Sequence, residues 1–206
     1  IMFSYKIIKR FLDIILSVVG LLILLPVFII VFLCLICVNK GRPFYFQERP
    51  GKNECVFKII KFKSMNDKTD LHGSLLPNAQ RVTKFGNFIR KYSLDEIPQL
   101  VNIIKGDMSL IGPRPLRVHY LPYYTQKESI RHSIRPGITG LAQVSGRNLL
   151  SWDEKLLLDI KYVDTMSFKT DSIILFQTIK KIFVTNNIEL DLNMPDLDDE
   201  RRHKLI

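Results

Sequence analysis

The chain has 206 residues, enough for one domain or for one domain with a membrane anchor. Lys and Arg total 30 against 20 Asp and Glu, and this positive excess points to an anionic partner: a nucleic acid, an acidic lipid or a phosphorylated substrate. Three cysteines exclude a disulfide framework, and the C-x-x-C pair lies in an apolar run, where redox or zinc chemistry is not expected.

An uncharged run of Leu, Ile, Val and Phe occupies residues 14–38 and is long enough to cross a bilayer as a helix. Pro26 lies in its middle, where it removes a helical hydrogen bond and predicts a kink or a break. Lys and Arg flank both ends of the run, so the positive-inside rule places both ends in the cytoplasm. Two arrangements fit: a re-entrant helix that bends at Pro26, or an ordinary spanning helix with a kink.

Two short strands are expected next, at 44–47 and 57–62. Pro50 and Gly51 between them predict a type II turn and therefore a hairpin. Lys61 in the second strand could reach a phosphate or could be solvated, which is the usual fate of a strand lysine. A polar loop at 66–78 follows.

Helices are expected at 81–91 and from 97 to Gly106, whose glycine ends the second one. Asp95 and Glu96 lie between them as adjacent carboxylates among cations, including Arg90 and Arg114. In this arrangement the cations would hold an anionic substrate, and a carboxylate would attack it or hold a metal.

The ordinary alternative for the acid pair is a helix start, because Ser93 and Glu96 have the spacing of a capping box. The two interpretations are compatible, since a helix dipole keeps a carboxylate in the first turn ionised.

Two rigid loops follow. Prolines on both sides of Arg114 favour an extended backbone, and a rigid arginine suits bidentate recognition of phosphate. The segment 135–148 has glycines that let backbone amides approach an anion and Arg147 to supply charge, although most such loops are only turns.

Two helices are predicted towards the end of the chain. The first, from about 152 to 163, has a capped start at Ser151, and the second, near 171–184, could pack on the core or lie in the membrane interface. The acidic segment from 189 onwards is expected to be mobile.

Together these stretches resemble the monotopic phosphoglycosyl transferases, the bacterial sugar transferase family, over about residues 6–184. The small bacillosamine-phosphate transferase type is similar in length. The segments that carry the resemblance occur in one order, at 47–51, 57–65, 94–100, 105–115 and 135–144. One position departs from the family: Leu25 precedes Pro26, where the family commonly has serine, so the bend lacks a hydroxyl that could bond a freed carbonyl.

The resemblance implies a mainly α fold with a small β-hairpin (α+β), in a monotopic membrane protein with interfacial amphipathic helices. It implies three parts: a re-entrant, proline-broken membrane helix at 2–40, a catalytic domain on the cytoplasmic face at 41–188, and a mobile charged tail at 189–206. The expected location is the bacterial inner membrane.

The implied reaction moves a sugar 1-phosphate from a UDP-sugar to polyprenyl (undecaprenyl) phosphate and releases UMP, as a first membrane step of glycoconjugate or polysaccharide assembly. By resemblance, Asp95 is the nucleophile that forms a phosphosugar-aspartyl intermediate and also contacts Mg²⁺, and Glu96 assists as a base or by positioning. The resemblance and the charges together assign phosphate binding to Lys61, Arg90, Arg114 and Arg147.

Two alternatives stay open. A membrane-bound hydrolase of nucleotide sugars could use the same acid pair and metal. A non-catalytic, membrane-anchored protein that binds polyanions would explain the charge and the anchor, but it leaves the acid pair unexplained. Because adjacent carboxylates repel a polyanion, we expect no nucleic-acid partner. The sequence holds no signal for the sugar or for the oligomeric state.

Overall fold

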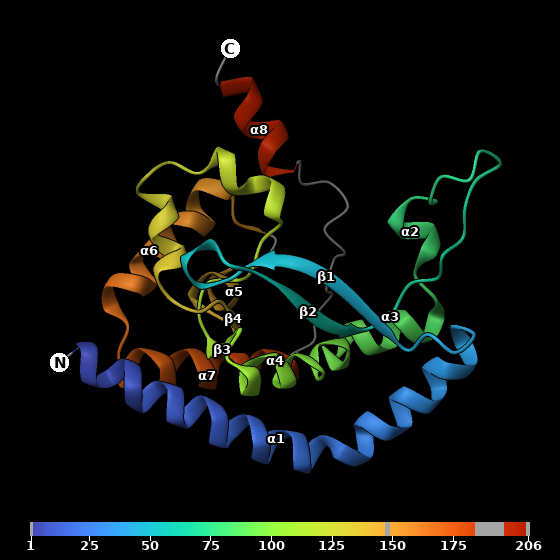
Figure 1. Cartoon of the computed structure of the whole chain (residues 1–206), viewed down its shortest axis with the longest axis horizontal. Helices are drawn as coiled ribbons and strands as arrows, with labels where there is room; N and C mark the ends of the chain where they lie inside the picture. Colours follow the sequence, from blue (N-terminus) through green and yellow to red (C-terminus); the bar gives the residue numbers. More distant parts are fainter. Residues whose placement is uncertain (1, 147–148, 184–195, 205–206) are drawn as a thin grey trace.

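The structure is a computed structural model that describes residues 2–146, 149–183 and 196–204. It is mainly α-helical with a small antiparallel hairpin, as the sequence predicts (Figure 1). The helices are α1 (Met2–Val38), α2 (Asn78–Arg81), α3 (Lys84–Lys91), α4 (Gln99–Lys105), α5 (Leu141–Ser145), α6 (Trp152–Thr165), α7 (Phe168–Phe183) and α8 (Leu197–Lys204). The strands are β1 (Phe44–Pro50), β2 (Val56–Phe62), β3 (Ser109–Ile111) and β4 (Gly137–Thr139), and the 3₁₀ segments are η1 (Lys52–Glu54), η2 (Leu94–Glu96), η3 (Val118–Tyr123) and η4 (Glu128–Ser133).

The hairpin pairs β1 with β2 in antiparallel register from Phe44 opposite Phe62 to Pro50 opposite Val56. The predicted type II turn is wrong: such a turn needs positive φ at Gly51, which instead has φ −101°. The chain reverses through η1, where Asn53 and the residue after it take positive φ. Asparagine tolerates the left-handed region, so the reversal forms two residues later than the Pro-Gly pair suggests.

A second, parallel pair joins β3 to β4, in segments where the sequence predicted only rigid loops. The backbones on the two sides approach closely at Gly112 and Gly137. A Cβ on Gly137 would lie 2.1 Å from the Gly112 nitrogen, so this pairing requires a residue without a side chain. The pair holds the start of the loop that carries Arg114, because Gly137 N also donates to the Pro113 carbonyl at 2.9 Å.

The helices around the acid pair differ from the prediction in two ways. The expected helix at 81–91 is divided, because Thr83 caps α3 by accepting from Gly86 N at 2.8 Å. The predicted capping box is wrong: Ser93 has φ 55°, and its side chain makes no cap bond. Asp95 and Glu96 therefore lie in the short η2 segment and not in the first turn of a long helix. The predicted end of α4 at Gly106 is confirmed by its φ of 104°.

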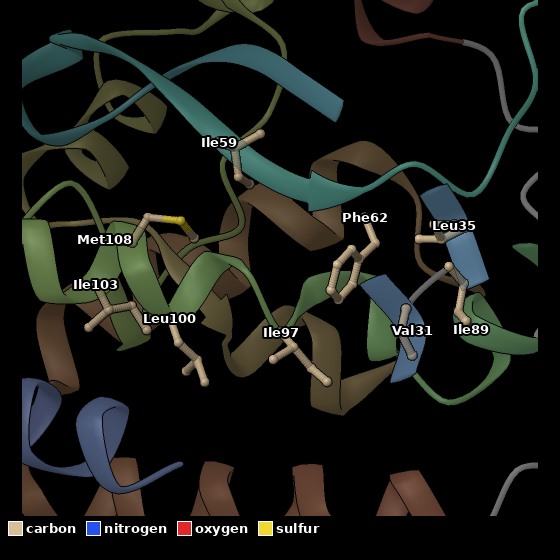
Figure 2. Packing of buried hydrophobic residues seen from close by; sticks show 9 residues of the cluster. All are labelled: Val31, Leu35, Ile59, Phe62, Ile89, Ile97, Leu100, Ile103 and Met108. Carbon is tan, nitrogen blue, oxygen red and sulfur yellow. The ribbon is translucent and has the colours of Figure 1, made fainter. Parts of the chain in front are cut away.

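The largest hydrophobic core joins the C-terminal half of α1 to the hairpin and to α3 and α4. Figure 2 shows its buried residues: Val31, Leu35, Ile59, Phe62, Ile89, Ile97, Leu100, Ile103 and Met108. Val31 and Leu35 are 3% and 0% exposed, so one face of this half of the apolar run packs on protein. Burial of side chains this size stabilises by about 1.5–3 kcal/mol each, which fixes the end of α1 to the domain.

The N-terminal half of α1 is held on the same domain by polar contacts. Arg10 donates to the last carbonyls of α4, those of Ile103 at 2.7 Å and Ile104 at 3.0 Å. The Asp13 carboxylate, 4% exposed, accepts from Ser109 Oγ at 2.7 Å and from the Leu110 N–H at 3.0 Å. The helix runs beneath the rest of the molecule and bends in its middle (Figure 1). Within the described residues, this is the one helix whose length and composition suffice to cross a membrane.

The end of the chain is partly described. The capped start at Ser151 is confirmed, because Ser151 and Glu154 form a complete capping box at the start of α6. Residues 189–195 and 205–206 of the predicted mobile tail lie outside the described residues. Between them α8 packs on η3 and α6 through Leu197, which is fully buried beside Tyr120 and Trp152.

Candidate active site

A pocket of about 350 Å³ lies between the hairpin, the η2 segment and the loop after β3. Positive side chains dominate its charged lining: Arg49, Lys61, Arg90, Arg114 and Arg117. Two carboxylates, Glu96 and Asp196, also face it, and its apolar and amide lining includes Ile59, Gln99, Leu116, Tyr120 and Trp152. A pocket with five cations against two acids is suited to a ligand that carries several negative charges.

Glu96 forms ion pairs with two of the residues that were predicted to bind phosphate. Its Oε1 lies 2.7 Å from Lys61 Nζ and 3.4 Å from Arg114 Nη2. Burial by itself would raise the pKa of Glu96, but the two cations together lower it to about 2. Glu96 is therefore ionised throughout the physiological range, and it holds Lys61 and Arg114 together at one edge of the pocket.

Asp95 has a different environment, although it is the adjacent residue. It is partly exposed and is not itself among the residues that line the pocket, although Glu96 next to it is. Within the described residues its carboxylate has no hydrogen bond or ion pair. Burial and the neighbouring Glu96 charge raise the pKa of Asp95 to about 6, against the opposing effects of Lys61, Arg90 and Arg114. The pair thus contains one carboxylate bound by cations and one that no described side chain bonds.

The structure brings together most of the residues predicted for the site. Lys61 from β2, Arg90 from the end of α3 and Arg114 from the loop after β3 all line the same pocket. Arg147 lies outside the described residues. The side chain of Arg114 is half exposed, which leaves its guanidinium accessible to a ligand.

Arg49 was not assigned from the sequence, although the segment that contains it was noted. It donates to Gln47 Oε1 at 2.6 Å, and no carboxylate lies within ion-pair distance of it in the described part of the chain. Burial, followed by repulsion from Arg114 and Arg117, lowers the pKa of Arg49 to about 10. Arg49, Arg114 and Arg117 carry more positive charge than the nearby carboxylates balance, which suits the binding of an anion. Sequence reasoning could not find this grouping, because it depends on the hairpin register, which turns Arg49 towards the loop that carries Arg114.

Gln99 is a second residue that sequence reasoning missed. It is 2% exposed and lines the pocket three positions after Glu96, and among the described residues its Nε2 has no acceptor. A buried amide donor without a partner is destabilising by about 1–3 kcal/mol, so Gln99 is poised to donate to a ligand oxygen. Its position three residues after Glu96 was the feature of the sequence that could have placed it in the site.

Asp196 and the aromatic rings of Tyr120 and Trp152 line another part of the pocket. Asp196, just before α8, accepts from Arg117 and from Tyr120 Oη, the latter at 2.8 Å. In the described part of the chain, the one cluster of three groups with metal-ligand geometry includes Asp196 and consists of His119, Asp196 and Asp198. It does not include Asp95, for which we predicted a metal.

Comparisons with known proteins agree with the sequence resemblance. The sequence profile of the family described as bacterial sugar transferase matches residues 4–185. The chain is 45% identical to the uncharacterized sugar transferase EpsL of Bacillus subtilis over 89% of this chain and 91% of that protein. It is 40% identical to the galactosyl transferase CpsE of Streptococcus agalactiae and 37% identical to the undecaprenyl-phosphate galactose phosphotransferase of Salmonella typhimurium. These matches cover 88% and 87% of this chain but only 43% and 41% of those two proteins.

Proposed function

Since this chain belongs to the bacterial sugar transferase family and is a phosphoglycosyl transferase, we propose that it moves a sugar 1-phosphate from a UDP-sugar to polyprenyl phosphate. The products are polyprenyl-diphosphate-sugar and UMP. The acceptor is suggested by the name of the Salmonella relative, and the UDP donor by the family resemblance. The observation that carries the proposal is the unequal acid pair, with Glu96 bound to two cations and Asp95 free beside a cationic pocket.

The reaction proceeds in two displacements at one phosphorus atom. An Asp95 carboxylate oxygen attacks the sugar-bearing phosphorus of the donor, the bond from that phosphorus to the UMP oxygen breaks, and UMP leaves with the electron pair. An oxygen of polyprenyl phosphate then attacks the same phosphorus, and the Asp95 carboxylate is released unchanged. With a pKa of about 6, Asp95 is mostly ionised at neutral pH and can act as this nucleophile.

Glu96 supports the reaction by positioning. A carboxylate whose pKa is about 2 is a weak base, so the positioning role fits Glu96 better than the role of general base. It holds Lys61 and Arg114 where charge accumulates on the transferred phosphate. Arg49, Arg90 and Arg117 extend the positive surface along the rest of the pocket and suit the remaining negative charge of the donor.

One carboxylate of the acid pair, that of Asp95, also suits Mg²⁺. Carboxylate oxygens are the hard ligands that this ion takes, and the Asp95 carboxylate is not engaged by any described side chain. We propose that Asp95 would hold the ion, which would supply positive charge to the donor diphosphate.

The membrane arrangement follows from how α1 is attached. Arg10 and Asp13 fix its first half, and Val31 and Leu35 fix its second half, to the same domain. Between these contacts, exposed apolar side chains such as Leu22, at 65%, point away from the domain. We propose that α1 is re-entrant and enters and leaves the bilayer on one face, because a spanning helix would place its two halves on opposite sides.

Further features support a monotopic protein on the cytoplasmic face of the inner membrane. The bilayer surface there is anionic and attracts the basic residues that flank the apolar run. Helix α7 lies beside α1 and also exposes apolar side chains, with Phe168 at 64% and Phe176 at 70%, which suits an interfacial position (Figure 1). The division into a membrane helix at 2–40, a catalytic domain at 41–188 and a tail at 189–206 stays part of this proposal, with the addition that α1 supplies part of the domain's core.

The experiment is a nucleotide-release assay with the purified protein, Mg²⁺ and a panel of UDP-sugars, with and without polyprenyl phosphate in detergent or vesicles. We expect at most one equivalent of UMP per chain without acceptor and many turnovers with it. Multiple turnovers without acceptor would indicate a hydrolase. Binding of a UDP-sugar without release of UMP, with or without acceptor, would indicate a binding protein. Asp95→Asn serves as the inactive control.

A further inference from the structure

Arg131 and Asp159 form a buried ion pair behind the active-site loop. Arg131, in η4, is 2% exposed, and Asp159, in α6, is 4% exposed. Arg131 donates to Asp159 Oδ2 from Nε at 3.0 Å and from Nη2 at 2.8 Å. Replacement of a buried ion pair by apolar side chains is often neutral or stabilising, so stability alone is a weak reason for this pair.

The same guanidinium reaches the active-site loop. Arg131 Nη2 also donates to the main-chain carbonyl of Arg114 at 2.6 Å, and its Nη1 contacts Tyr124 Oη at 3.3 Å. Asp159 therefore orients the Arg131 guanidinium, and this guanidinium holds the backbone of Arg114. The Arg114 side chain in turn lies 3.4 Å from Glu96.

The loop depends on this contact because of its two prolines. Pro113 and Pro115 have no N–H, so this part of the loop can be bonded mainly through carbonyls. The Pro113 carbonyl accepts from Gly137 N at 2.9 Å, and the Arg114 carbonyl accepts from Arg131. The first bond ties the loop to β4 and the second ties it to η4. Half of the Arg114 side chain is exposed and its contact with Glu96 is long, at 3.4 Å, so its direction also depends on where it leaves the backbone.

We propose that Arg131, oriented by Asp159, is a positioning residue for Arg114 in the transfer reaction, and this inference rests on the proposed function. Arg131 is not among the residues that line the pocket, and it acts through the carbonyl of Arg114, which is. Without that bond, the peptide between Arg114 and Pro115 can rotate, and the guanidinium samples directions that do not point at the transferred phosphate. A small misplacement of such a group is enough to slow a reaction that depends on orientation.

The test is a double-mutant cycle. The pair is replaced as Arg131→Met with Asp159→Leu, which removes both charges and the bond to the loop, in the wild-type chain and in Arg114→Ala. We expect kcat/KM for UMP release to fall about tenfold in the wild-type background and less than twofold in Arg114→Ala, because the positioned side chain is then absent. Equal losses in both backgrounds, or no loss in the wild type, would overturn the proposal.

Two further variants keep the test decisive. Arg131→Lys retains a positive charge beside Asp159, but its side chain is shorter and it lacks the Nε bond to the carboxylate, so it should remain folded, weaken the bond to the Arg114 carbonyl and show the same coupling to Arg114. Tyr5→Phe removes a partly buried hydrogen bond to Asp171 outside the pocket lining and should have the same effect in both backgrounds.

Binding of UDP, measured by calorimetry on the same proteins, supplies a readout that needs no turnover. If the wild type releases no UMP, the proposed function fails. Coupling in UDP affinity between Arg131 and Arg114 would then still support the positioning role in an anion site, and additive effects on that affinity would reject it.

Discussion

Replacement of Asp95 by asparagine should abolish transfer and, at neutral pH, make the protein more stable. The pKa of Asp95 is raised from 3.8 to about 6, mainly by burial and by the charge of Glu96. One pKa unit corresponds to about 1.4 kcal/mol, so the ionised carboxylate destabilises the native state by up to about 3 kcal/mol. The asparagine amide must still be desolvated, and we therefore expect a net gain of about 1–2 kcal/mol.

The gain should depend on pH in a defined direction. Because the native state holds the Asp95 proton more tightly than the unfolded state, the destabilisation is absent below about pH 4 and complete above about pH 7. For a chain of this size, a gain of 1–2 kcal/mol corresponds to a rise in Tm of about 2–8 °C at pH 8. The rise should disappear at pH 4, where the native carboxyl group is already protonated.

Thermal unfolding of wild type and Asp95→Asn at pH 4, 6 and 8, followed by circular dichroism in one detergent without Mg²⁺, measures this difference. Asp164→Asn, which changes an exposed aspartate on α6, is the matched control and should show no such trend. A variant that is less stable than wild type at pH 8, or that is shifted equally at every pH, would refute the electrostatic description of the acid pair.

Three other substitutions test separate parts of the structure. Arg114→Lys should lower kcat/KM by the equivalent of about 1–3 kcal/mol, since a lysine cannot replace a bidentate fork; unchanged kinetics would remove Arg114 from the site. Gly137→Ala would place a Cβ 2.1 Å from the Gly112 nitrogen, so unfolding should show a loss of at least about 2 kcal/mol, and a wild-type Tm would contradict the close approach. Pro26→Ala lets α1 straighten, so Ser4→Cys in a chain without its native cysteines should react more with an impermeant thiol reagent on whole cells than in the Pro26 form. Strong labelling in the Pro26 form would contradict the re-entrant arrangement.

The elements with local signals were predictable from the sequence. The apolar run, the hairpin, the capping box at Ser151 and the glycine end of α4 all follow from residues close together in the chain. The turn of the hairpin was predicted at the wrong residues because Pro50 and Gly51 resemble a type II turn, whereas Asn53 provides the positive φ. The β3–β4 pair was missed because two three-residue strands have no periodicity to detect.

The acid pair was predicted from the chain, but the difference between its two carboxylates was not. That difference depends on Lys61, 35 positions before Glu96, and on Arg114, 18 positions after it. Such contacts are set by packing and not by local spacing. For the same reason the role of α1 in the core was missed: a continuous apolar sequence does not distinguish Val31, which packs on protein, from Leu22, which is exposed.

The central claim, that Asp95 carries the sugar phosphate during transfer, is tested most directly by intact-mass analysis of the wild-type protein. The protein is incubated with Mg²⁺ and a UDP-sugar that it accepts, without polyprenyl phosphate, and is then quenched. We predict one added phosphosugar mass per chain, located on Asp95 by peptide mapping and lost when polyprenyl phosphate is supplied. An active enzyme that shows no adduct, or that carries it on another residue, would contradict the assignment.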